Sequence, residues 1–319
     1  MGEIIKNYYK KALELNGKSY HEVGGRMLCY IILNYNDYET TYNCVKSLIN
    51  FETISKIIVV DNNSPDGSYL KLKDGLASEK IDVIQKDHNG GYGFGNNYGI
   101  RFAINKYSPE IIVVSNPDVE ISEKTIRACE DYLLHSDDNI IVAPLMQNID
   151  GSFNYDCVWK CPTYYEYLMF SLSFGKKFDF HYSMIDYDCE SFDCECVAGS
   201  WLMIHPERFE SIGMYDENIF LYCEETSVGI RAKKAGYRTT LLPQESFVHK
   251  HPVSISKSIK SEYTQQKMMW KSRLYMLDNY YKRTCFRKFI SRVIFGYAMI
   301  ERRIIHFLRL LKRHRNFAK

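Results

Sequence analysis

The 319-residue sequence predicts an α/β fold, in which a mixed, mostly parallel sheet is flanked by helices and followed by a C-terminal basic helical extension. Three observations predict it. Apolar runs of strand length alternate with helical patterns through residues 27–143. Clusters of Asn, Asp, Gly and Pro follow several of these runs, at the edge where open α/β sheets bind ligands. Beyond residue 256 the pattern becomes helical and strongly basic.

The elements are expected in the following order. A helical pattern over residues 1–25 ends at Gly24-Gly25, and strands and helices then alternate as in a parallel sheet with right-handed crossovers. Strands are expected at 27–33, 57–60, 81–85, 111–114, 140–143, 197–204 and 239–242. Helices are expected at 41–51, 68–78, 100–106, 122–134, 207–213, 224–236, 268–281 and 286–311. The irregular stretch 144–195 is long for a connector, so it is expected to be a functional insertion.

The segment that follows the strand at 111–114 carries the first candidate site. Pro117 cannot continue a β-ladder, so Asn116 and Asp118 lie at the carboxyl end of a buried strand. An amide oxygen and a carboxylate at this spacing suit a hard divalent cation that carries a diphosphate. Because Asn, Pro and Asp are also common in strand-end turns, this stretch alone leaves both interpretations open.

Two further segments carry candidate chemistry. Residues 89–99 contain four glycines close together before a helical pattern, as phosphate-binding loops do, although the dinucleotide and P-loop signatures are both absent. A structural turn stays open for this segment. Glu224 and Glu225 open the helix at 224–236, where acidic residues also interact favourably with the helix dipole.

The net charge of +2 conceals a strong asymmetry. Residues 257–319 hold 17 basic and 3 acidic residues, which leaves 24 basic and 36 acidic residues in the remainder. The balance is therefore +14 in the tail and −12 elsewhere, which indicates that the tail meets an anionic surface. Membrane lipid and nucleic acid are the candidates, and a helix packed on the domain with a solvated basic face is the alternative.

The cysteines and the N-terminus predict a cytoplasmic location. The first residues are charged and lack the apolar core of a signal peptide, so we interpret the ten cysteines as reduced thiols. The spacings of Cys189, Cys194 and Cys196 do not fit the paired pattern of a zinc site. No apolar run is long enough to span a bilayer.

Six segments together resemble a known family. They are Leu33 to Asn36, Val60 to Gly67, Asn89 to Gly99, Ser115 to Asp118, Gly199-Ser-Trp201 and Glu224-Glu225. Their order is similar to that of inverting family 2 glycosyltransferases of the GT-A fold, and most of all to bacterial rhamnosyltransferase-like members. The resemblance implies a Rossmann-like GT-A domain over residues 26–251, between a helical lead-in at 1–25 and a basic amphipathic tail at 252–319.

The resemblance also implies which residues hold a nucleotide-sugar donor. Asp61 is expected to accept a hydrogen bond from the imide N–H of uracil or thymine, and the glycine-rich segment is expected beside the base and ribose. The donor-binding residues that it implies are Asn34, Tyr35, Asp61, Asn62, Asn63, Gly91, Asn96, Asn97, Asn116 and Asp118.

The same resemblance implies a metal site and a catalytic base. Asp118 is similar to the last residue of the family's D-x-D motif and is expected to bind Mg²⁺ or Mn²⁺, with His249 as a further ligand. Glu225 matches the second carboxylate of the family's Glu-Asp pair, the expected base, while Glu224 orients it or contacts the acceptor. Ser227 stands where the family often has another Asp, which leaves the details of acceptor binding open.

The acceptor is expected to be a glycan or a lipid-linked oligosaccharide in bacterial surface polysaccharide synthesis, contacted by Gly199, Ser200 and Trp201. The favoured donor is dTDP-L-rhamnose, with UDP-galactose, its furanose form and UDP-N-acetylglucosamine as alternatives. We expect a peripheral location at the inner face of the cell membrane, bound through the tail, with no nucleic-acid partner; a homodimer stays open.

Two other classes of protein are considered. A nucleotidyltransferase usually needs a basic glycine-rich signature near its N-terminus, which is absent. A catalytically silent lipid-binding scaffold is disfavoured because Asp61, Asp118 and Glu225 are all present.

Overall fold

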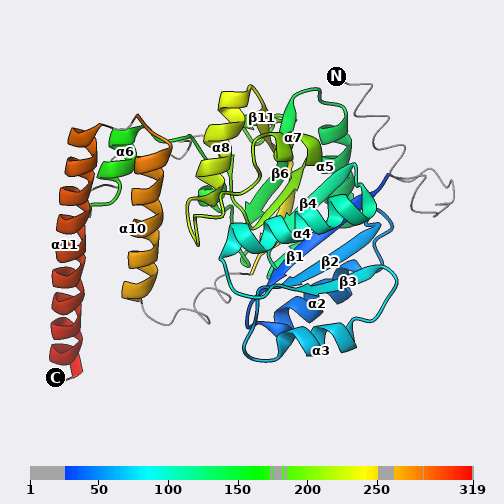
Figure 1. Cartoon of the computed structure of the whole chain (residues 1–319), viewed down its shortest axis with the longest axis horizontal. Coiled ribbons are helices and arrows are strands. Elements are labelled where there is room, and N and C mark those ends of the chain that lie inside the picture. The colour runs from blue at the N-terminus through cyan, green and yellow to red at the C-terminus, as the bar shows by residue number, and fades with distance from the viewer. Residues whose placement is uncertain are drawn as a thin grey trace.

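The computed structural model describes residues 26–172, 175, 182, 185–250, 262–282 and 284–317, with the side chains of residues 262 and 306–317 left aside. The helical pattern expected over 1–25 lies outside the described residues. A central sheet with helices packed around it forms most of the molecule, and a group of helices stands at one side (Figure 1).

Within the described residues, nine strands form the central sheet, in the order β3-β2-β1-β4-β10-β6-β11-β5, with β8 paired to β11. Its strands are β1 (Leu28–Asn34), β2 (Lys56–Asp61), β3 (Ile81–Gln85), β4 (Ile111–Ser115), β5 (Val119–Ile121), β6 (Asn139–Gln147), β8 (Phe192–Cys194), β10 (Trp201–Ile204) and β11 (Arg238–His249). β1 pairs in parallel with β2 and β4, β2 with β3, and β6 with β11, whereas β10 runs antiparallel between β4 and β6. The mixed, mostly parallel sheet predicted from the sequence is confirmed.

The sheet forms where the sequence concentrates β-branched residues. All five residues of β4 are buried, as are six of the seven in β1, because helices cover both strands. The helices around the sheet are α2 (Tyr38–Leu48), α3 (Ser68–Gly75), α4 (Tyr92–Tyr107), α5 (Glu123–Leu134), α7 (Pro206–Ser211) and α8 (Glu224–Ala235). In Figure 1, α4 crosses β1 and β2, which it contacts.

One local prediction is wrong. The glycine-rich segment is not a loop before a helix at 100–106, because α4 begins at Tyr92 and already includes Gly93, Gly95 and Gly99. These glycines lie where the helix approaches its neighbours closely; an added Cβ on Gly95 would come within 2.4 Å of Leu33, and one on Gly99 within 2.8 Å of Ile31. The glycines therefore allow tight helix–sheet packing.

The insertion and the tail meet in a second cluster of helices. α6 (Tyr164–Met169), from the insertion, packs against α10 (Glu262–Asn279) and α11 (Cys285–Phe317), as Figure 1 shows. Their apolar cluster includes Tyr167, Trp270 and Phe295, and also Ile219 of the segment that leads into α8. None of the described helices is long and apolar enough to cross a membrane.

This packing bears on the boundary that we placed at residue 251. Ser272 of α10 donates a hydrogen bond to the carbonyl of Leu221 at 2.7 Å, and Tyr275 and Tyr280 both donate to Asp216. α10 is thus joined by hydrogen bonds to the segment before α8. The division into residues 1–25, 26–251 and 252–319 stays a prediction. The hydrogen bonds of α10 to the segment before α8 speak against a separate tail.

Candidate active site

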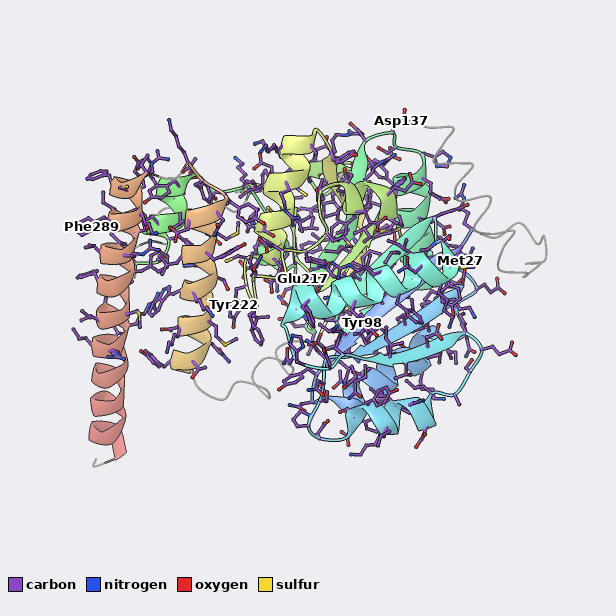
Figure 2. The ribbon with its side chains drawn as sticks, viewed as in Figure 1. Met27, Tyr98, Asp137, Glu217, Tyr222 and Phe289 are labelled. Carbon is purple, nitrogen blue, oxygen red and sulfur yellow. The ribbon has the colours of Figure 1, made fainter. Side chains whose placement is uncertain are left out.

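A cavity of about 540 Å³ opens where the sheet meets the cluster of α6, α10 and α11. Asn116 and His249 line it from the strand ends, Gly199 and Ser200 from the segment before β10, and Glu224 and Glu225 from α8. The rest of the wall comes from the insertion, from α10, from Tyr92 and from residues 221–223, which lead into α8. Tyr222, which borders the cavity, lies between α10 and the sheet-bearing part of the molecule (Figure 2). The described structure therefore places six of the sixteen predicted site residues around one space, among them both glutamates of α8.

Glu224 and Glu225 are presented by an abrupt helix start. Tyr222 and Cys223 adopt the left-handed conformation, at φ of 69° and 76°, and α8 begins at the next residue. The Glu225 Oε1 atom accepts a hydrogen bond from the backbone N–H of Gly199 at 3.2 Å, whereas Glu224 is 2% exposed. The bond to Gly199 fixes the Glu225 carboxylate against the cavity wall.

The two carboxyl groups have pKa values above the ordinary range for glutamate. Burial raises the pKa of Glu224 well above that range, and the neighbouring charge of Glu225 raises it further. Burial also raises the pKa of Glu225, while its own backbone N–H and that of Gly199 oppose the rise. A half-buried carboxylate with a raised pKa is a stronger proton acceptor than an exposed one, which is what a general base requires.

Gly199→Ala tests how closely the cavity wall holds Glu225. A Cβ on Gly199 would lie 2.6 Å from the Glu225 Oε1 atom, so the carboxylate has to move. We expect the variant to keep its melting temperature within a few degrees, because the displaced group is a side-chain end, while turnover falls about tenfold or more. Steady-state kinetics and thermal melts of both proteins check this; unchanged turnover would contradict the position assigned to Glu225.

Asp118 and His249 lie together on neighbouring elements. The Nε2 atom of His249, the last residue of β11, is 3.2 Å from the Oδ1 atom of Asp118, between β4 and β5. β11 pairs antiparallel with β5, and the N–H of Lys250 donates to the Asp118 carbonyl, which fixes the two residues relative to each other. Their exposed fractions are 5% and 6%.

This pair fits a divalent metal. A carboxylate and an imidazole are ligands that Mn²⁺ accepts, and the diphosphate oxygens of a bound nucleotide can fill further positions. Among the described residues no group of three or more His, Cys, Asp and Glu side chains is placed to hold a metal by itself. The protein therefore offers two ligands, and a metal at this place depends on the nucleotide for the rest.

The predicted base-binding residues form a hydrogen-bonded cluster at the ends of β1 and β2. Asp61 is fully buried and accepts from the side chains of Asn34 and Gln85 and from the N–H of Ser64. Asn34 also accepts from Thr41. Tyr35 is half-buried and Asn63 is exposed, with a φ of 60°. The structure brings these residues together, and their contact with a base stays a prediction.

Four other predicted site residues have structural roles in this conformation. Trp201 is fully buried and donates to the Tyr30 hydroxyl, so no surface of it is available to an acceptor. The Asn97 side chain bonds the N–H and carbonyl of Tyr215, and the Asn96 side chain donates to the Tyr92 carbonyl. Gly91 has a φ of 99°, and a Cβ there would lie 2.0 Å from the Phe220 carbonyl oxygen.

In this conformation the four residues hold parts of the fold together, and their contacts with donor and acceptor stay predictions. Gly91, Asn96 and Asn97 fix the start of α4 against the segment that leads into α8, because the Tyr92 N–H also donates to the Phe220 carbonyl. Asn62 belongs to the same arrangement, since its amide donates to the Asn89 side chain and the Gly91 carbonyl. Their amide nitrogens serve the fold at this edge of the sheet, whereas the buried Oδ1 atoms of Asn62 and Asn96 have no hydrogen-bond partner among the described residues.

The sequence did not indicate several cavity residues. Tyr92 donates to the Gly199 carbonyl at 2.6 Å, and Trp159 donates to Thr226 of α8. Asn154, Asp156, Tyr167 and Phe170 come from the insertion, and Met269 and Arg273 from α10. The number of aromatic residues in the insertion was the available signal, but nothing in the sequence places α10 beside the start of α8.

The arrangement of strands around this cavity is the GT-A architecture of glycosyltransferases. GalNAc-T7, solved with UDP, GalNAc and Mn²⁺, aligns with a TM-score of 0.54 at 15% identity, over 88% of this chain and 57% of that one. Mannosyltransferase PcManGT from Pyrobaculum calidifontis, in complex with GDP-Man and Mn²⁺, aligns with a TM-score of 0.54 at 13% identity, over 98% and 87%. At these identities the likeness shows the fold.

The chain belongs to glycosyl transferase family 2, whose family model matches residues 29–194. The low-salt glycan biosynthesis hexosyltransferase Agl10 of Haloferax volcanii is 29% identical over 232 residues, 71% of this chain and 68% of that protein. The dTDP-rhamnosyl transferase RfbF of Shigella flexneri is 25% identical, over 69% and 67%. The N-acetylglucosaminyl-diphospho-decaprenol L-rhamnosyltransferase of Mycobacterium tuberculosis is 24% identical, over 60% and 66%. The family, the fold and the glycosyltransferase class expected from the sequence are confirmed.

Proposed function

We propose that this glycosyltransferase is an inverting, divalent-metal-dependent enzyme that transfers a sugar from a nucleotide-diphosphate donor to a hydroxyl of a glycan or lipid-linked oligosaccharide. The observation that carries the proposal is the shared cavity. His249, paired with Asp118, lines the same space as Glu225. One wall thus offers ligands for a metal-bound diphosphate and another offers a base.

The donor that we favour is dTDP-L-rhamnose, used in bacterial surface polysaccharide synthesis. Two of the relatives are rhamnosyltransferases by name, at 25% and 24% identity. A third is named a hexosyltransferase, which supports UDP-galactose, its furanose form or UDP-N-acetylglucosamine as alternatives. The expectation that Asp61 contacts a uracil or thymine base rests on the family resemblance, because the Asp61 side chain is fully buried and already accepts three hydrogen bonds.

The chemistry follows from the positions of the carboxylates. Asp118 and His249 would hold Mg²⁺ or Mn²⁺, which offsets the charge that develops on the leaving diphosphate. Glu225 takes the proton of the acceptor hydroxyl as its oxygen attacks the anomeric carbon from the side opposite the diphosphate, so the configuration inverts. Glu224 takes no direct part in the reaction. Its buried carboxyl group contributes to the electrostatic environment of Glu225.

The aromatic wall of the cavity suits the acceptor. Trp159, Tyr167 and Phe170 lie on the side of the insertion, and flat aromatic rings with polar edges provide stacking surfaces for a sugar. We assign acceptor selection to this insertion, with the backbone of Gly199 and Ser200 on the facing wall.

Calorimetry tests the donor directly. The full chain is titrated with dTDP-rhamnose, UDP-galactose and UDP-N-acetylglucosamine, each with and without Mn²⁺. Binding of one donor that depends on Mn²⁺ supports the proposal and identifies the sugar. Absence of binding for all donors, with and without Mn²⁺, contradicts it and favours a silent scaffold.

We further propose that α11 binds the enzyme to anionic lipids at the inner face of the cell membrane. Its outer side carries an apolar stripe of six residues that are 53% to 71% exposed: Phe286, Phe289, Val293, Tyr297, Ile300 and Ile304. Figure 2 shows Phe289 on the side of α11 away from α10. The opposite side packs inward through Phe295 and Ala298. One side of α11 therefore packs against α6 and α10, and the exposed stripe is the side that we assign to the membrane.

The charge of α11 favours lipid over a second copy of the chain as the cover for this stripe. Residues 285–317 contain nine basic residues and one acidic residue, a balance of +8. Two such helices would repel each other, whereas acidic headgroups attract the basic residues and the bilayer accepts the apolar stripe.

The triple variant Phe289→Ser, Val293→Ser, Ile300→Ser removes apolar surface from the stripe. It is expected to co-sediment with phosphatidylglycerol vesicles about tenfold less than the wild type, or still more weakly. The control is Cys285→Ser, an exposed change on the same helix. Unchanged sedimentation of the triple variant, or a stripe-dependent dimer in light scattering, would contradict the membrane assignment.

A further inference from the structure

Arg273 is a buried cation in the cavity. It lies on α10, is 8% exposed, and lines the cavity together with Glu225 and His249. Its guanidinium lies over the rings of Phe170 and Tyr167, at 5.0 and 5.8 Å from their centres. Ser272 beside it donates to the Leu221 carbonyl, so the position of this part of α10 is fixed close to the start of α8.

Among the described residues, no carboxylate is in contact with this guanidinium. In the described part of the chain its one hydrogen bond is to the Ser171 hydroxyl, at 3.4 Å, and no carboxylate lies within 4.0 Å of it. An arginine side chain has five N–H donors, and burying its charge without an anion is unfavourable. Arginine also binds phosphate through two parallel hydrogen bonds. The arrangement is therefore that of an anion site whose anion comes from a ligand.

The position of Arg273 assigns this anion to the acceptor. The donor diphosphate is expected at the strand ends, beside Asp118 and His249. Arg273 instead stacks on rings of the insertion, which form the wall that we assign to the acceptor. Tyr167, under the guanidinium, also donates to the Cys223 sulfur at 2.6 Å, which places this wall next to the start of α8. An anion bound here lies on the acceptor side of Glu225.

We propose that Arg273 binds the diphosphate of a lipid-linked acceptor and thereby makes the enzyme specific for acceptors that carry one next to the sugar. The inference rests on the proposed function. A diphosphate on Arg273 would leave the adjoining sugar in the same cavity as Trp159 and Glu225. A neutral glycan provides no group for this site.

The experiment uses farnesyl diphosphate as a soluble probe and farnesol as its neutral analogue. Binding of each to the full chain is measured by calorimetry, with UDP or dTDP and Mn²⁺ present at saturation so that the donor site is filled. The wild-type protein is expected to bind the diphosphate at least tenfold more tightly than farnesol. Arg273→Gln is expected to lose that difference, and Arg273→Lys, which keeps the charge, to retain part of it.

The matched control is Arg287→Gln. Arg287 also stacks on rings of α6, 4.8 Å from the centre of Tyr164 and 5.7 Å from that of Tyr165, but it does not line the cavity. This variant is expected to bind the probe as the wild type does. Nucleotide affinity, measured separately, is expected to be equal in all four proteins.

Three results would overturn the inference. They are a wild type that does not prefer the diphosphate over farnesol, an Arg273→Gln variant that keeps the preference, and displacement of the probe by nucleotide, which would place its diphosphate in the donor site. If the proposed function itself is wrong, the result differs: the wild type then binds no nucleotide, whatever its affinity for the probe.

Discussion

Glu225→Gln is expected to lower turnover by about 10²-fold or more while nucleotide-sugar binding stays intact. The amide keeps the size of the side chain and can keep the contact with the Gly199 N–H, but it cannot accept the acceptor's proton. Steady-state kinetics and calorimetry on the same preparation separate the two effects. Turnover close to that of the wild type would show that Glu225 is not the base.

The pH dependence of turnover provides a second measurement. Because burial raises the pKa of Glu225, the base becomes protonated and turnover falls as the pH drops through a value above about 4.3, the ordinary pKa of glutamate. The residual turnover of the Gln variant is expected to lack this acid limb. Glu210→Gln is the control, since burial also raises the pKa of Glu210 but its carboxyl lies outside the cavity.

Asp118→Ala is expected to abolish Mn²⁺-dependent donor binding, with a loss of about 10²-fold or more. Removing a partner of a metal ligand typically costs 10- to 100-fold in metal affinity, and Asp118 is proposed as a ligand itself. Calorimetry with the donor and electron paramagnetic resonance of bound Mn²⁺ check this result. A variant that binds Mn²⁺ and donor as the wild type does would rule out the metal site.

The control for this variant is Asp137→Ala. Asp137 is exposed and lies at the far edge of the sheet from Tyr222, which borders the cavity (Figure 2). It is expected to leave donor binding unchanged.

The sequence predicts the sheet well because its strands are marked locally. The apolar run of β4 ends at Pro117, and the segments after β1, β2 and β4 carry the polar residues that the structure brings to one edge. The helix that carries Glu225 could be predicted for the same reason, since it begins and ends with local signals. The role of Glu225 as a base comes from the family resemblance and stays a prediction. Short strands such as β5, with three residues, have too little pattern to be found.

The sequence does not predict features that depend on distant contacts. Asn97 and Trp201 lie in segments that resemble family motifs, yet in the structure they bond to Tyr215 and Tyr30, which lie far away in the chain. Arg273 looks like one of many basic residues in the tail, and only the packing of α10 distinguishes it. Gly93 and Gly95 suggested a loop because glycine has a low intrinsic helix propensity. In the structure both lie in α4, where the close approach of neighbouring side chains leaves no room for a Cβ atom.

The position of α10 has a consequence for protein synthesis. A ribosome makes the sheet, Asp118 and Glu225 before it makes residues 262–279, at about 5–20 residues per second. The nascent chain therefore contains its proposed donor-binding and proton-accepting groups before it contains one wall of the acceptor cavity. The docking of α10 against the segment before α8 is therefore the step that would complete the proposed acceptor site.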